Sequence, residues 1–105
     1  MSATGIQLGR LTPSPGGPWS LAGALTFDSV PQLWKQGGPL LAAAAAATTE
    51  VDLAGVEQVD SAGLALLVAW QAQVQGAGGV LRFRSMPERL LAIARISEAQ
   101  ALLGD

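Results

Sequence analysis

Side chains that could carry out chemistry are few in this chain of 105 residues. It contains no histidine and no cysteine, which removes the commonest general base, the commonest zinc ligand and all thiol chemistry. Asp52, Glu57 and Asp60 come close together in sequence and would suit catalysis by paired carboxylates. Carboxylates at strand ends and helix starts are ordinarily solvated or capping groups, however. An enzyme is therefore the class that the sequence favours least, and we expect no metal and no cofactor.

Ser61 has the most informative surroundings. Residues 59–64 read Val-Asp-Ser-Ala-Gly-Leu, so two good capping residues, Asp60 and Ser61, directly precede an apolar run. The Ser61 hydroxyl could cap the helix by accepting a hydrogen bond from a free backbone N–H. If solvent reaches it, the hydroxyl is also well placed for phosphorylation, because the helix dipole and free N–H groups favour an added anion. The neighbouring Asp60 would oppose that charge.

The helix that follows Ser61 has two apolar sides on a helical wheel. Leu64, Ala65, Val68 and Ala72 lie on the side of Ser61, whereas Gly63, Leu67, Trp70 and Val74 lie roughly opposite. Only one side is needed to cover a sheet. Either a partner protein or a neighbouring helix of the same domain covers the other. The predicted partner-binding residues are Asp60, Ser61, Ala62, Gly63, Leu64, Ala65 and Val68.

The sequence lacks the signatures of nucleotide and nucleic-acid binding. The glycine-rich residues 76–79 fall between a predicted helix and a predicted strand, whereas a dinucleotide loop follows a strand and opens a helix. The formal net charge is −2 and the six basic residues are scattered, so no dense basic stripe is available for a phosphate backbone. We therefore expect no nucleic-acid partner.

Strands are predicted where large apolar residues alternate with small or polar ones. Residues 19–25 and 80–84 show this pattern clearly, and residues 50–56 show it in part. In the segment 80–84 the arginines share one side, which predicts a strand with a solvated face. A first strand and a loop rich in proline and glycine are expected within residues 1–18.

Three helices are predicted between and after these strands. The first is capped by Thr26 or Ser29, is bent or interrupted at residues 37–39 and resumes over 40–47. The second runs from Ser61 to near Gly76. The third begins at a capping box over 85–88, and a similar capping motif is possible at 97–100. The order β-β-α-β-α-β-α predicts an α/β sandwich, in which about three to four helices cover a mixed sheet of four strands.

The length and composition indicate one globular domain over residues 1–105. Half of the residues are apolar and 13% are charged, which is a composition that folds. The first residues show no secretory signal pattern, and the apolar runs are shorter than the roughly 20 residues that cross a bilayer. We expect a cytoplasmic protein that meets a membrane only through a partner.

The segment from Val51 to Leu64 resembles the signature of STAS domains, in which an Asp-Ser or Asp-Thr pair opens a helix after the third strand. More narrowly, residues 21–25, 33–34, 51–53 and 59–67 resemble MlaB-type members of this family in order and spacing. The similarity extends from about Trp19 to the C-terminus. It implies a STAS-type sandwich.

The resemblance also implies a function. MlaB-type proteins are cytoplasmic, non-catalytic subunits that bind the ATPase of an inner-membrane ABC system, which moves phospholipids and maintains outer-membrane lipid asymmetry. Ser61 matches the family's Ser/Thr position, which belongs to the partner-binding surface in MlaB-type proteins and is phosphorylated in anti-sigma factor antagonists. Asp60 and Gly63 match the motif around it. Two alternatives stay open: an anti-sigma factor antagonist that binds an anti-sigma factor kinase, and a lipid or small-ligand carrier that acts alone.

Overall fold

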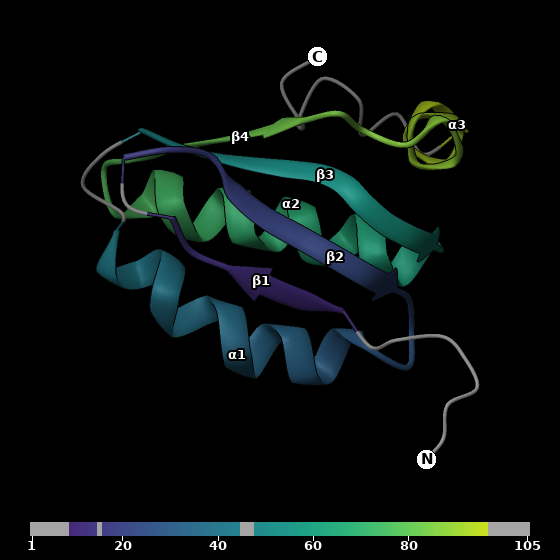
Figure 1. Cartoon of the computed structure of the whole chain (residues 1–105), viewed down its shortest axis with the longest axis horizontal. Coiled ribbons are helices and arrows are strands. Elements are labelled where there is room, and N and C mark those ends of the chain that lie inside the picture. Colours follow the sequence, from purple (N-terminus) through teal and green to yellow (C-terminus); the bar gives the residue numbers. More distant parts are fainter. Residues whose placement is uncertain (1–8, 15, 45–47, 97–105) are drawn as a thin grey trace.

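The computed structural model describes residues 9–14, 16–44 and 48–96, which follow the order β-β-α-β-α-β-α (Figure 1). The predicted order and fold class are confirmed. The strands are β1 (Arg10–Thr12), β2 (Trp19–Leu25), β3 (Thr48–Val59) and β4 (Val80–Arg84), and the helices are α1 (Val30–Ala43), α2 (Ser61–Gly76) and α3 (Glu88–Ile96).

The strands form one mixed sheet in the order β1-β2-β3-β4. β1 is antiparallel to β2, whereas the pairs β2–β3 and β3–β4 are parallel. α1 joins β2 to β3, α2 joins β3 to β4, and the two helices contact each other behind the sheet (Figure 1). Leu25 pairs with Val59 at the ends of β2 and β3. Both helices therefore begin at the same edge of the sheet, and this edge carries the candidate site.

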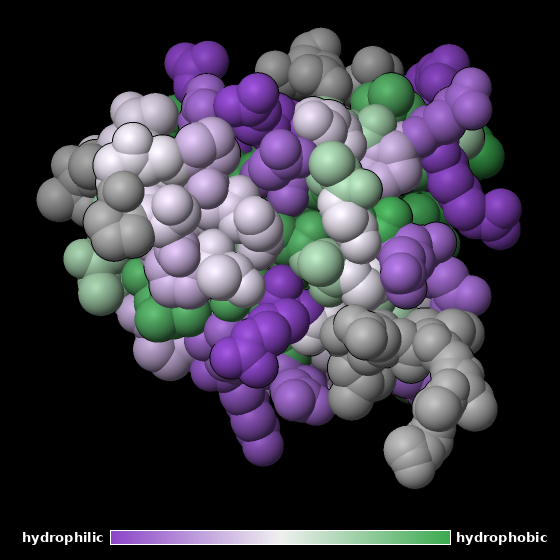
Figure 2. Space-filling view, in the orientation of Figure 1, coloured by the Kyte–Doolittle hydropathy of each residue, from purple (hydrophilic) through white to green (hydrophobic). Residues whose placement is uncertain are grey.

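The hydrophobic core lies between the sheet and its helices. Alternate residues of each strand point into it, as Leu81 and Phe83 of β4 do, while Arg82 and Arg84 are exposed. The predicted solvated face of this strand is confirmed. Hydrophilic side chains are spread over the side of the molecule shown in Figure 2, which is the view of Figure 1. The core side chains that are fully buried are Trp70, Leu11, Leu21, Leu25, Leu33, Leu41, Leu53, Leu67, Leu81, Leu90 and Val51.

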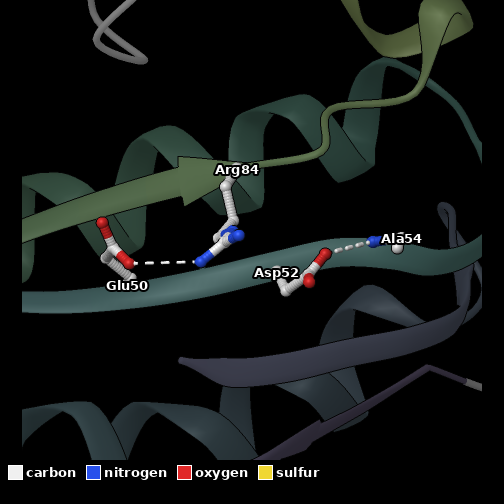
Figure 3. A network of polar contacts seen from close by, with 4 residues as sticks. All are labelled: Glu50, Asp52, Ala54 and Arg84. Carbon is white, nitrogen blue, oxygen red and sulfur yellow. Dashed lines mark hydrogen bonds and ion pairs between the residues drawn. The ribbon is translucent and has the colours of Figure 1, made fainter. Parts of the chain in front are cut away.

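The structure places two of the candidate carboxylates, Asp52 and Asp60, far apart. Glu50 pairs with Arg84 at 3.6 Å between Oε1 and Nη1, and the Asp52 carboxylate accepts a hydrogen bond from the Ala54 N–H at 2.8 Å (Figure 3). Both side chains of the ion pair are about half exposed, so it contributes little to stability, about 0–1 kcal/mol. Asp60 follows the far end of β3, about 25 Å along the strand from Asp52. These two carboxylates do not form a catalytic pair.

Two predicted helix boundaries were wrong. α1 is continuous through Pro39 up to Ala43, because packing of its apolar side on the core and a hydrogen bond from the Gln73 amide to the Gly38 carbonyl at 2.9 Å hold the segment helical. α3 begins at Glu88 rather than at Ser85, whose φ of 57° lies in the left-handed region and cannot start a helix. Residues 45–47 and 97–100 lie outside the described residues. In the described chain no helix is long and apolar enough to cross a membrane.

Gly37 lets α1 approach Trp70 of α2 closely. A Cβ atom at position 37 would lie 2.6 Å from Trp70 Cζ2 and 2.9 Å from Leu11 Cδ2, so we expect Gly37→Ala to lower the free energy of unfolding by about 2 kcal/mol through overpacking. Gly38→Ala is the matched control, because a Cβ there meets only Gln73 Oε1 at 3.9 Å and alanine favours a helix. Urea denaturation measures both variants. Equal stability of the two would contradict this account of the α1–α2 contact.

Candidate functional site

Asp60 caps the N-terminus of α2. Its backbone is extended, with φ −136° and ψ −173°, and its Oδ1 accepts hydrogen bonds from the N–H groups of Ala62 at 2.9 Å and Gly63 at 3.1 Å. These are two of the N–H groups that a helix start leaves without partners. Ser61 is the first residue of the helix. The capping role considered for Ser61 therefore belongs to Asp60.

Asp60 also fixes the loop between β2 and α1. Its Oδ2 accepts a hydrogen bond from the Phe27 N–H at 2.9 Å. Within the same loop the buried Ser29 hydroxyl accepts from the Thr26 N–H at 2.9 Å and donates to the Ala24 carbonyl at 2.7 Å. These bonds hold the loop between β2 and α1 in place, and they set the backbone of Phe27, whose side chain is 76% exposed, beside Asp60.

Ser61 itself is exposed, and its hydroxyl forms no hydrogen bond within the described part of the chain. The fold does not need this hydroxyl, so it is free to meet another molecule. The N–H groups of Ala62 and Gly63, which could attract a phosphate, are already bound to the Asp60 carboxylate. The helix start is therefore less favourable for a phosphate on Ser61 than the sequence indicated.

Three of the predicted contact residues, Gly63, Leu64 and Val68, pack in or against the core. Gly63 is buried, and a Cβ there would collide with the backbone carbonyl of Leu25. The Leu64 side chain is 4% exposed in the core, and Val68 is half-buried against the same core cluster, which includes Leu90 of α3. The domain buries the Leu64 side chain and covers part of Val68, so this side of α2 offers less free surface than the helical wheel indicated.

The exposed apolar surface of α2 is the one that faces α1. Ala62 is half-buried and Ala65 is exposed, and both line an open groove of about 500 Å³ between the two helices. We call it the α1–α2 groove; its lining residues are Val30, Pro31, Trp34, Ala62, Ala65, Leu66 and Ala69. Sequence reasoning missed the part that α1 contributes. The large side chain of Trp34 could have indicated that α1 contributes to a binding surface, but periodicity does not show which element a helix face contacts.

Replacing Asp60 tests the link between the cap and the loop. We expect Asp60→Ala to lower the free energy of unfolding by about 2 kcal/mol, because the carboxylate accepts three backbone N–H groups. Asp60→Asn keeps one acceptor oxygen and should lose less. Urea denaturation gives the stability, and amide hydrogen exchange at Phe27 should quicken in Asp60→Ala. If both variants match the wild type, Asp60 does not hold this site together.

Comparison with known proteins agrees with the geometry. No curated protein matches the chain. A family model described as "Mlab, STAS domain" matches residues 19–104, which include β2, β3, β4, all three helices and the Asp60-Ser61 pair. The match covers most of the chain, and the fold has the element order expected for this family. The chain therefore belongs to the STAS domain family, as a MlaB-like member.

Proposed function

We propose that this chain is a non-catalytic STAS subunit that binds the ATPase of an inner-membrane ABC phospholipid transporter and regulates or stabilises it, so that outer-membrane lipid asymmetry is maintained. Membership of the MlaB-like group supports this proposal. The observation that carries it is the exposed Ser61 hydroxyl, which has no structural role in the described chain and precedes Ala62, a residue that lines the α1–α2 groove. Such a surface suits protein docking.

The surroundings of Ser61 favour docking over catalysis. A serine hydroxyl is a weak nucleophile unless a base takes its proton. Asp60 is the adjacent carboxylate, and both of its oxygens already accept backbone N–H groups. The chain contains no histidine that could act in its place. We therefore assign Ser61 to recognition.

Docking at this surface also explains how the subunit could be switched. A partner that covers Ser61 and the groove next to it would exclude water from both. A negative charge placed on Ser61 would then be buried against apolar atoms without a counter-ion, which is costly. In this proposal the protein lies on the cytoplasmic side of the inner membrane and is held there by the transporter ATPase.

The proposed function is tested by removing the protein from its native cell. We expect the amount or the ATP turnover of the ABC transporter ATPase to fall and phospholipid in the outer leaflet of the outer membrane to rise. Wild-type protein should reverse both changes, whereas a variant that folds but cannot dock should not. Unchanged ATPase and unchanged outer-leaflet phospholipid would contradict the proposal.

A second candidate is an anti-sigma factor antagonist, and the exposure of Ser61 in the first turn of α2 favours it. A kinase could reach this hydroxyl, and the phosphate would end the interaction with an anti-sigma factor kinase. Intact-mass analysis of protein from the native cell distinguishes the two functions. Phosphate on Ser61 in one fraction of the protein, and an anti-sigma factor kinase bound to the unphosphorylated fraction, would establish this second function.

A further inference from the structure

We propose that the α1–α2 groove binds an amphipathic α-helix of the partner, with a carboxylate of that helix placed against Lys35. The inference rests on the proposed function only in taking the occupant to be a protein. The argument begins with the lining of the groove, which consists of Val30, Pro31, Trp34, Ala62, Ala65, Leu66 and Ala69. None of these side chains carries a charge, and only the Trp34 indole has a hydrogen-bonding group.

The apolar surface continues past Trp34. This side chain is 45% exposed and also lines a second open groove of about 420 Å³, together with Lys35, Gly38, Pro39, Ala42 and Gln73. The two grooves follow α1 from Val30 to Ala42, which is about 18 Å at the rise of an α-helix. A partner helix of about three turns matches this length.

A helix fits the groove better than an extended segment does. An extended chain would bury backbone N–H and C=O groups against a lining that offers them almost no partners, and each unpaired group costs free energy. A helix satisfies these groups internally. The floor of the groove consists of Ala62, Ala65 and Ala69, whose small side chains share one side of α2 and let another helix approach closely.

The positive charge of Lys35 favours a partner helix that carries a negative charge at this position. Lys35 is the only lysine in the sequence, it is exposed, and the only ion pair within the described residues joins Glu50 to Arg84. Lys35 follows Trp34, which lines both grooves, and Lys35 itself lines the second groove. A carboxylate on the partner helix would neutralise this charge next to the apolar lining, and the pair would favour one register of the helix in the groove. An acyl chain would fill apolar space without any carboxylate at this position.

The test uses the complex of this protein and its partner purified from the native cell. A carbodiimide joins an amine directly to a carboxylate that contacts it, and Lys35 supplies the single lysine amine. We expect Lys35 to be joined to an Asp or Glu in a partner segment whose apolar residues recur at positions i, i+3 or i+4, and i+7. A joined segment without this spacing, no joined partner at all, or a co-purified lipid that leaves with Ala65→Arg would each overturn the proposal.

Variants give a second, independent measurement. Ala65→Arg and Lys35→Glu should each weaken partner binding at least tenfold, and changing the joined partner carboxylate to lysine should restore binding to Lys35→Glu. Ala92→Arg on the exposed side of α3 and Arg82→Glu on the open sheet face are the matched controls and should bind normally. Melting temperatures confirm that each variant folds.

The outcomes separate the two proposals. If the ABC transporter ATPase binds the wild type and the groove variants equally well, the groove proposal fails and the proposed function stands. If the protein whose helix is joined to Lys35 is not an ABC transporter ATPase, the groove proposal stands and the proposed function fails. Loss of the reciprocal charge rescue would overturn the assigned role of Lys35.

Discussion

Gly63→Ala is expected to lower the free energy of unfolding by about 3 kcal/mol, at the upper end of the range for overpacked sites. A Cβ atom at this position would collide with the backbone carbonyl of Leu25 and would lie 2.8 Å from its Cγ. A backbone carbonyl at the end of β2 cannot rotate away as a flexible side chain can. The start of α2 would have to move away from the sheet, and Ser61 would move with it.

Gly76→Ala is the matched control for this prediction. Gly76 ends the same helix, and a Cβ there meets no heavy atom within 4 Å. Alanine at that position should be neutral or stabilise the protein slightly, because it favours a helix over glycine. Chemical denaturation of both variants measures the difference. Gly63→Ala with the stability of Gly76→Ala would show that α2 does not need this close approach.

Ser61→Asp is expected to leave stability nearly unchanged and to weaken partner binding about a hundredfold. The fold tolerates the change because Asp60 supplies the cap and an acidic residue in the first turn suits the helix dipole. Binding suffers because a charge buried at an interface without a counter-ion costs about 3 kcal/mol. Titration calorimetry with the purified partner gives the affinity, and thermal unfolding gives the stability.

Two variants control for the hydroxyl and for the added charge. Ser61→Ala removes the hydroxyl without adding charge and should bind much more tightly than Ser61→Asp. Ser20→Asp adds the same charge at an exposed serine of β2 and should bind as the wild type does. Comparable weakening in Ser20→Asp would mean that net charge, not the position of Ser61, governs the interaction.

The alternation of large apolar residues with small or polar ones was enough to predict two strands of the sheet. The alternation of Leu81 and Phe83 with Arg82 and Arg84 predicted β4 with the bounds that it has. The predicted strand over residues 19–25 likewise coincides with β2. In both segments a two-residue period matches a strand that has one face on the core.

Features that depend on tertiary contacts could not be predicted from local sequence patterns. The wheel of α2 showed two apolar sides but not the elements that they contact, and in the structure Leu64 lies in the core while Val68 packs against it. The adjacent Asp60 and Ser61 both suit a cap, and the bond from the Phe27 N–H to Asp60, from a loop 33 residues away, belongs to the structure alone. Propensity likewise predicted a bend or an interruption at residues 37–39, where packing kept α1 continuous.

The most direct test of the central claim is purification of the tagged protein from its native cell, as wild type and as Ser61→Asp, with quantitative mass spectrometry of the proteins that come with it. We expect an ABC transporter ATPase and its permease with the wild type, and their loss from Ser61→Asp at an unchanged melting temperature. The same ATPase in equal amounts with both proteins would contradict the claim that Ser61 lies at the docking surface. An anti-sigma factor kinase in its place would assign the protein to transcriptional switching.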